Sequence, residues 1–171
     1  MAIKGGSDQF QILIESHRGI LYKVSKCYCS NPDDRDDLIQ EVIVQLWRSF
    51  PTFDESKSFS TWMYRIALNV AISNLRTEKV RSKHIVSADD RILEAVDVTA
   101  NVSETALMLY QLIEQMEPLN RALMLLFLDG FSHREISEVL GISETNVATK
   151  IGRLKKVIQQ ALSTDGQGIR G

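Results

Sequence analysis

Apolar residues in the first part of the chain recur every three to four positions, which is the period of an amphipathic helix rather than of a strand. Over residues 9–28 this apolar stripe consists of Phe10, Ile14, Leu21 and Val24. The pattern predicts one helix over residues 9–28, with the stripe packed against the rest of the fold.

A second helix is predicted directly after the short polar segment "CSNPDD". Asn31 is a favourable N-cap, and Pro32 suits the first helical position because an N–H there would have no helical partner. The aspartates that follow lie where the helix dipole favours negative charge. This helix is expected to reach about residue 49, with Leu38 and either Leu46 or Trp47 on its inner side.

The segment "FPTFDESKSFS", residues 50–60, has no helical period and predicts a loop. Trp62, Ile66 and Leu75 then supply apolar positions for a third helix from about residue 58 to 76. Residues 79–101 are mixed and aperiodic, which is typical of a linker.

Helical periodicity returns at Ser103, a plausible N-cap, and stops at Pro118. Residues 119–128 form a further predicted helix, which the pair Asp129-Gly130 ends with a C-cap signal.

The stretch "SHREISEVLGISETNVATKIGRLKK", residues 132–156, is typical of a helix-turn-helix. Ser132 and Glu135 have the spacing of a capping box, in which each side chain accepts a hydrogen bond from the other residue's backbone N–H. Gly141 permits a sharp turn without steric cost, and Ser143 caps the second helix.

The second helix of this motif has an apolar stripe at Val147, Ile151, Leu154 and Ile158, which must face the core. Short polar residues followed by cations occupy its other sides, a pattern that suits base-edge and phosphate contacts in a DNA major groove. The alternative is the ordinary solvated face of a packed helix. The candidate DNA-contacting residues are Thr145, Asn146, Thr149, Lys150, Arg153 and Lys156.

These elements predict an all-α protein with two small helical domains joined by a flexible linker. We place a three- to four-helix bundle at residues 1–78, the linker at 79–102, a helix-turn-helix domain at 103–162 and a tail at 163–171.

Charge is segregated along the chain, although the formal net charge is only −2. An acidic block lies between residues 33 and 41, and basic clusters lie at residues 65–83 and 150–156, so two partners of opposite charge are expected. No apolar run is long enough to span a membrane and no signal peptide precedes the first helix, so the chain is expected in the cytoplasm.

The sequence offers little for catalysis. It contains no nucleotide-binding loop, no metal-ligand spacing and no convincing nucleophile–base pair, so we expect no enzyme activity, no cofactor, no metal and no small-molecule substrate. Cys27 and Cys29 are interpreted as ordinary thiols, with metal binding or redox sensing as the alternative.

Residues 36–76, "DDLIQEVIVQLWRSFPTFDESKSFSTWMYRIALNVAISNLR", closely resemble region 2 of bacterial sigma factors. The segment "DLIQE", the pair Leu46-Trp47 and the segment "FSTWMYRIALNVA" match the extracytoplasmic-function (ECF) group in order and spacing. The stretch "LNRALMLLFLDGFSHREISEVLGISETNVATKIGRLKK" resembles region 4 of that family. The resemblance implies an alternative sigma factor that directs RNA polymerase to promoters by recognising −10 and −35 elements.

The resemblance also implies roles for the N-terminal domain. The helix that carries "DLIQE" is implied to dock on a coiled coil of the polymerase β′ subunit, through Asp37, Gln40, Glu41 and Val44. The favourable interaction of acidic side chains with the helix dipole explains why Asp33 and Asp34 lie in the first turn. It does not explain Glu41 well, because Glu41 lies beyond that turn.

The loop at residues 53–59 and the helix after it are implied to bind the −10 element, with one base flipped out of the DNA. We interpret Trp62 mainly as a core anchor, whereas stacking and core roles remain equally open for Phe59 and Tyr64. The implied −10 residues are Phe59, Tyr64, Arg65, Asn69, Arg76 and Lys79.

In the region 4-like segment, the candidate residues of the second helix fall at −35-reading positions, with departures from the common pattern. Lys150 stands where arginine is frequent, and lysine lacks the bidentate fork that arginine offers to guanine. Gly152 favours a closer approach of the duplex. The family also implies an anti-sigma partner, often at the inner face of the membrane. A stand-alone helix-turn-helix regulator is the alternative function.

Overall fold

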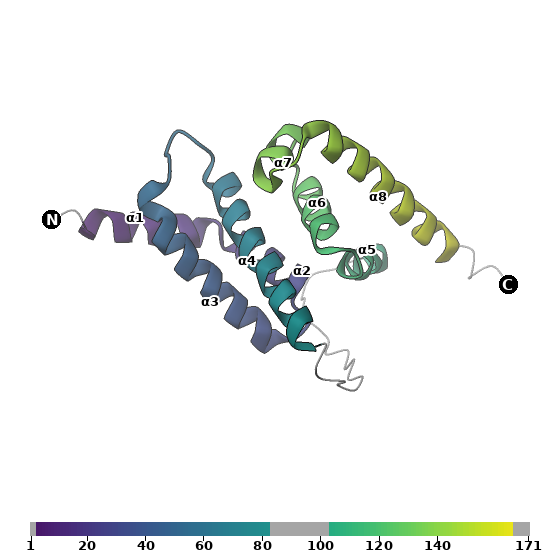
Figure 1. Cartoon of the computed structure of the whole chain (residues 1–171), viewed down its shortest axis with the longest axis horizontal. Helices are drawn as coiled ribbons and strands as arrows, with labels where there is room; N and C mark the ends of the chain where they lie inside the picture. Colours follow the sequence, from purple (N-terminus) through teal and green to yellow (C-terminus); the bar gives the residue numbers. More distant parts are fainter. Residues whose placement is uncertain (1–2, 83–102, 166–171) are drawn as a thin grey trace.

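The computed structural model describes residues 3–82 and 103–165 (Figure 1). Within these ranges every regular element is a helix, as predicted. The elements are α1 (Ile3–Ser16), α2 (Arg18–Tyr28), α3 (Pro32–Ser49), the short 3₁₀ helix η1 (Phe50–Thr52), α4 (Phe59–Ser82), α5 (Glu104–Glu114), α6 (Pro118–Leu128), α7 (His133–Leu140) and α8 (Glu144–Asp165).

The N-terminal region contains two helices, so the prediction of one helix over residues 9–28 is wrong. α1 begins at Ile3, and the chain leaves helical geometry at His17, whose φ is −118° and ψ is 18°. The ring nitrogen Nδ1 of His17 lies 2.8 Å from the carbonyl oxygen of Leu13, which also accepts a hydrogen bond of 3.2 Å from the His17 backbone N–H.

Helices α2, α3 and α4 form the N-terminal module, which packs around Val24, Val42, Leu46 and Met63. The predicted cap of α3 is confirmed, because the Asn31 side chain accepts a hydrogen bond of 2.9 Å from the backbone N–H of Asp33.

Helices α5–α8 form the C-terminal module, and its helix-turn-helix is confirmed. The Ser132 N–H donates to the Glu135 carboxylate at 2.7 Å, and the Glu135 N–H donates to the Ser132 hydroxyl at 3.2 Å. Gly141 ends α7 with φ +68°, a left-handed conformation that favours glycine. Val147 and Ile151 face the core as predicted.

Helices α4 and α8 extend beyond the limits predicted for their domains. α4 continues to Ser82, four residues into the predicted linker, and α8 continues to Asp165, three residues into the predicted tail. The remainder of that linker, residues 83–102, and of that tail, residues 166–171, lie outside the described residues.

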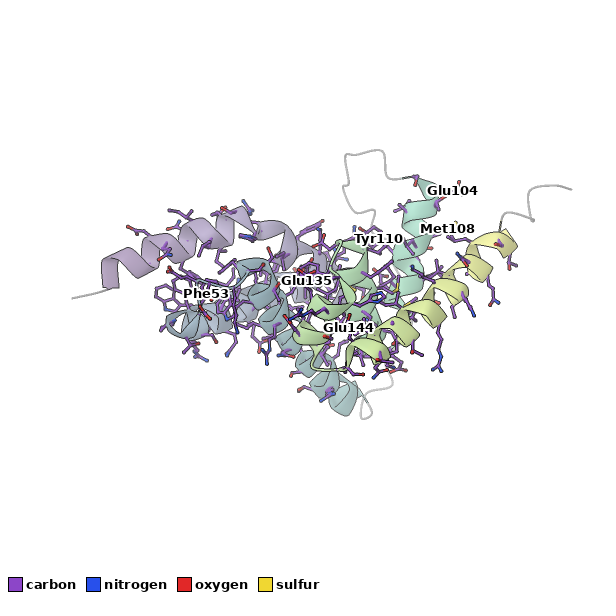
Figure 2. All side chains as sticks on the ribbon, turned by 90° about the horizontal axis from the view of Figure 1, so that it is seen from above. Phe53, Glu104, Met108, Tyr110, Glu135 and Glu144 are labelled. Carbon is purple, nitrogen blue, oxygen red and sulfur yellow. The ribbon has the colours of Figure 1, made fainter. Side chains whose placement is uncertain are left out.

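The two modules pack directly against each other rather than standing apart. α6 and α7 contact α4, while α5 and α6 contact α2, and buried residues of both modules form one continuous hydrophobic cluster. On α5, whose Tyr110 is labelled in Figure 2, the tyrosine ring lies 5.4 Å from the Lys26 ammonium of α2. This packing determines which candidate residues are accessible.

Candidate polymerase and promoter interfaces

The four residues expected to bind polymerase lie on one exposed side of α3. Asp37, Gln40, Glu41 and Val44 are all exposed, because Leu38, Val42 and Leu46 take the opposite side into the core. The Glu41 carboxylate accepts a hydrogen bond of 2.7 Å from the amide nitrogen of Asn74 on α4. We call this face, residues 37, 40, 41, 44 and 47, the α3 stripe.

Trp47 is a further candidate contact. The sequence left open whether Leu46 or Trp47 lies on the inner side of this helix. Leu46 is fully buried, whereas Trp47 remains 45% exposed with its ring edge-to-face on Phe10 at 5.1 Å. Trp47 comes seven residues after Gln40, so the two lie about 20° apart around the helix at about 100° per residue. This spacing in the sequence could have placed Trp47 on the same side of the helix as the other four candidates.

A groove of about 110 Å³ runs between α3 and α4 beside the α3 stripe. Its walls carry four carboxylates, those of Asp34, Asp37, Glu41 and Glu78. Apart from the Asn74 contact to Glu41, no hydrogen bond or ion pair within the described residues uses these carboxylates. The groove therefore favours a cationic side chain from a partner.

The loop between α3 and α4 is held by an aromatic cluster. The ring of Phe59 lies 5.4 Å from Phe53, 5.3 Å from Trp62 and 4.9 Å from His17, and only 8% of Phe59 is exposed. In this structure Phe59 is therefore a packing residue and offers no open stacking face. Trp62 lies in the same cluster, in agreement with its interpretation as an anchor.

Polar contacts order the exposed part of this loop. Asp54 Oδ1 accepts hydrogen bonds from the Ser56 hydroxyl at 2.7 Å and from the Ser56 N–H at 3.0 Å, and these bonds lower the pKa of Asp54. Gln9 on α1 donates to the Glu55 carboxylate at 3.0 Å. The loop is thus shaped before any ligand binds.

The remaining −10 candidates divide between two faces of α4. Arg65, Asn69 and Arg76 are exposed and lie within about 40° of one another at about 100° per residue, so they form one stripe. Tyr64 lies about 140° from Asn69 on the same count and is fully buried. Lys79 belongs to α4, but its side chain lies outside the described residues.

Tyr64 lies in the contact between the modules. Its hydroxyl donates to Asp129 Oδ2 at 2.6 Å, and its ring meets Phe131 edge-to-face at 5.3 Å. Burial, followed by the Asp129 carboxylate, raises the pKa of Tyr64. The helical spacing in the sequence indicates that Tyr64 and Asn69 lie on different sides of α4. The sequence gave no sign that the partner of Tyr64 would be Asp129.

The second helix of the helix-turn-helix, α8, presents its candidate residues outward. Thr145, Asn146, Thr149, Arg153 and Lys156 are exposed, and Lys150 is half-buried. No ion pair within the described residues neutralises Arg153 or the two lysines. The positive charge of this face is therefore available to an anion such as a phosphate backbone.

Gly152 lies on this outer face of α8. A Cβ atom at this position would meet nothing within 4 Å, so the protein itself gives no packing reason for glycine in the helix. A glycine at position 152 is therefore better explained by something outside the chain, such as the close approach of a DNA duplex to α8.

The two cysteines lack the features of reactive thiols. Burial raises the pKa of Cys27 to about 12 and that of Cys29 to about 11. Because the thiolate is the nucleophile, both shifts argue against a reactive, redox-sensing role for these thiols.

The two modules that carry these surfaces each match a known protein family. Residues 13–81 match the family model described as Sigma-70 region 2, and residues 106–158 match that of Sigma-70, region 4. The chain is 25% identical to the ECF RNA polymerase sigma factor SigW of Bacillus subtilis, over 93% of this chain and 91% of SigW. It is 28% identical to SigX of the same organism, over 90% of this chain and 83% of SigX.

Two solved structures share the fold. One is CnrH in complex with the cytosolic domain of CnrY, with a TM-score of 0.64, 22% identity and coverage of 93% of this chain and 90% of that chain. The other is the sigma factor RpoE in complex with the anti-sigma factor NepR from Bartonella quintana, with a TM-score of 0.66, 17% identity and coverage of 95% and 99%.

Proposed function

Because the chain belongs to the ECF group of sigma-70 RNA polymerase sigma factors, we propose a division of its surface among core polymerase and the two promoter elements. The α3 stripe binds polymerase, α4 and the preceding loop bind the −10 element, and α8 binds the −35 element. The observation that carries this proposal is that α3 and α8 each leave a polar stripe exposed, one acidic and one cationic, in the two matched regions.

The polymerase contact is assigned to the β′ coiled coil. Asp37, Gln40, Glu41 and Val44 supply an acidic and partly apolar stripe, which complements a basic helix with apolar positions. Trp47 adds a large, half-exposed aromatic side chain, a type that is enriched among the energetically dominant residues of interfaces. The acidic groove beside the stripe has the charge to accept one lysine or arginine side chain of the coiled coil.

For the −10 element, the exposed stripe of α4 is the best-supported surface. Asn69 is assigned to base recognition, and Arg65, Arg76 and Lys79 are assigned to the DNA backbone. Phe59 supports the shape of the loop from inside the aromatic cluster. A contact from Tyr64 to DNA requires separation of the modules, because Asp129 and Phe131 cover this side chain.

For the −35 element, the N-terminal half of α8 enters the major groove. Asn146 and Arg153 have the donors to read base edges, whereas Thr145, Thr149, Lys150 and Lys156 suit backbone contacts. Because lysine is a point charge, Lys150 contributes to affinity more than to base choice.

An anti-sigma protein is proposed as a further partner. The two similar solved structures are complexes of CnrH with CnrY and of RpoE with the anti-sigma factor NepR. The described residues include no helix that is long and apolar enough to cross a membrane. We place the chain in the cytoplasm, where polymerase and promoters are, with sequestration at the inner membrane face if its anti-sigma partner is membrane-bound.

The alternative of a stand-alone helix-turn-helix regulator explains α7 and α8 alone. It leaves the match of residues 13–81 and the exposed α3 stripe without a role. The proposed function assigns no chemistry to the chain itself, since bond formation belongs to the polymerase.

Transcription in vitro with core polymerase tests the function. Reactions with the purified chain on genomic DNA, followed by sequencing of RNA 5′ ends, should give start sites that share upstream −10 and −35 sequences and that are absent without the chain. Start sites identical with and without the chain, together with no retention on immobilised core polymerase, would refute the function.

A further inference from the structure

We propose that α1 positions the loop that is assigned to the −10 element, and that Gln9 is the residue that holds the middle of this loop in place. The loop, residues 53–58 between η1 and α4, is called the −10 loop. The proposal rests on the proposed function for the binding of DNA by this loop. Gln9 is a positioning residue, because it acts through Glu55 rather than on DNA.

α1 contacts the residues that flank the −10 loop on both sides. Phe10 packs edge-to-face on Phe50, which precedes the loop, at 5.1 Å. The ring of His17, directly after α1, lies 4.9 Å from that of Phe59, which follows the loop. At about 100° and 1.5 Å per residue, positions 10 and 17 lie within about 20° of each other and about 10 Å apart along the helix. One side of α1 therefore spans the two ends of the loop, and Figure 1 shows α1 crossing the end of α3 from which the loop leaves.

Gln9 adds a contact to the middle of the −10 loop. Its amide nitrogen Nε2 donates a hydrogen bond of 3.0 Å to Glu55 Oε1, across 46 positions of the sequence. Both residues are exposed, so the bond is not needed to satisfy a buried group. An exposed hydrogen bond adds little to overall stability. Its effect is local, because it restricts where the loop can lie relative to α1.

The hydrogen bonds within the −10 loop give it a local shape but do not fix its orientation. The Ser56 hydroxyl and N–H donate to the Asp54 carboxylate, and the Lys57 N–H donates to the Asp54 carbonyl oxygen at 2.9 Å. These bonds join residues two or three positions apart, so they move with the loop as a unit. Within the described residues, the bond from Gln9 is the one that joins residues 54–57 to another element.

A loop held in one orientation favours DNA binding for two reasons. It loses less conformational freedom on binding than a loop that moves, and such ordering is a main cost of association. Glu55 also carries a negative charge next to the proposed DNA surface. While its carboxylate is bonded to Gln9, it cannot turn toward a phosphate group and repel it.

The part of α1 that carries Gln9 lies outside the matched family region. The match to Sigma-70 region 2 begins at residue 13, whereas Gln9 and Phe10 precede it. Phe10 also packs on Trp47 of the α3 stripe at 5.1 Å. The family match therefore leaves the role of these two residues unassigned, and their contacts supply one.

The test uses variants of the full chain that remove, oppose or rebuild the bond. Gln9→Ala removes the donor, and Gln9→Glu places a second carboxylate against Glu55. Gln9→Glu combined with Glu55→Gln exchanges donor and acceptor and so rebuilds the bond. The matched control is Gln11→Ala, because Gln11 is the other exposed glutamine of α1 and lies about 200° from Gln9 around the helix.

The first measurement is DNA binding by each variant assembled with core polymerase. The probe is single-stranded DNA carrying the non-template −10 sequence of a promoter found by the transcription assay, and fluorescence anisotropy gives its dissociation constant. Binding should weaken about threefold in Gln9→Ala and about tenfold in Gln9→Glu. The double variant should bind within about twofold of the wild type, and Gln11→Ala should bind like the wild type. Affinity for core polymerase should be equal in all variants, because Gln9 is not part of the α3 stripe.

The second measurement is hydrogen exchange of the free chain by mass spectrometry. Peptides covering residues 53–58 should exchange faster in Gln9→Ala and Gln9→Glu than in the wild type, and the double variant should restore the wild-type rate. Peptides from residues 32–46 of α3 should exchange equally in all variants. A general loss of stability would accelerate both sets of peptides.

The outcomes separate this proposal from the proposed function. If Gln9→Ala and Gln9→Glu change neither loop exchange nor −10 affinity while transcription proceeds, the positioning role is refuted and the function stands. The role is also refuted if the variants weaken core binding and DNA binding equally, or if the double variant restores neither measurement. If exchange changes as expected but neither the wild type nor any variant binds −10 DNA or directs polymerase, the proposed function fails while the hold of Gln9 on the loop is retained.

Discussion

Replacement of Trp47 by alanine tests the polymerase surface most directly, because this side chain is exposed and no part of the free chain requires its outer half. The indole ring packs on Phe10, and 45% of the residue remains accessible. If the β′ coiled coil covers the α3 stripe, that exposed part becomes buried on binding.

The expected loss of affinity follows from the area. About 45% of a tryptophan of up to about 250 Å² is about 110 Å². At about 25 cal/mol per Å² this area corresponds to about 2.8 kcal/mol, or about a hundredfold weaker binding. Loss of the Phe10 contact also lowers the stability of the free chain, because edge-to-face aromatic pairs add about 0.5–1.5 kcal/mol to area burial.

Surface plasmon resonance with immobilised core polymerase measures the dissociation constant, and thermal melting checks that each variant is folded. The matched control is Tyr22→Ala, because Tyr22 is an aromatic residue of similar exposure, 51%, on α2 outside the stripe. A folded Trp47→Ala variant that binds within twofold of the wild type would show that the coiled coil does not cover this position.

Four further predictions follow from the same surfaces. Asp37→Lys combined with Gln40→Ala should abolish retention on core polymerase with unchanged helicity, and undiminished retention of the folded variant would contradict the role of α3. Arg153→Ala should reduce transcription from −35-dependent promoters while core binding is unchanged, and full activity on every promoter tested would remove this residue from DNA reading. Gly152→Ala should raise the free energy of unfolding by about 0.5–1 kcal/mol, because glycine is unfavourable within helices. The same variant should bind −35 DNA more weakly in gel-shift assays, and unchanged binding would exclude a close approach of the duplex to position 152. Cys27 should react with iodoacetamide about a thousandfold more slowly at pH 8 than an ordinary thiol, since a pKa raised from 9.0 to about 12 leaves it protonated, and rapid alkylation measured by mass spectrometry would show that the thiol is not shielded.

The features that were predictable from the sequence depend on neighbours within a few positions. The Asn31 cap, the capping box of Ser132 and Glu135, and the left-handed turn at Gly141 involve contacts across two to four residues, so the residue types alone specify them. The inward stripe of α8 follows in the same way from the helical period. Most candidate residues on α3 and α8 are exposed for this reason, since each lies opposite an apolar stripe.

Other features depend on which distant groups meet in space. The helical period places Leu46 with Leu38 and Val42 on the core side, but the partial burial of Trp47 depends on Phe10 of α1, whose ring lies edge-to-face with it. Tyr64 is an amphipathic side chain that suits either a DNA surface or a protein interior. It is buried here because Asp129, 65 positions away, accepts its hydroxyl hydrogen bond and Phe131 covers its ring. Periodicity reports which side of a helix is apolar, but it carries no information about which other element, or which other module, will cover that side.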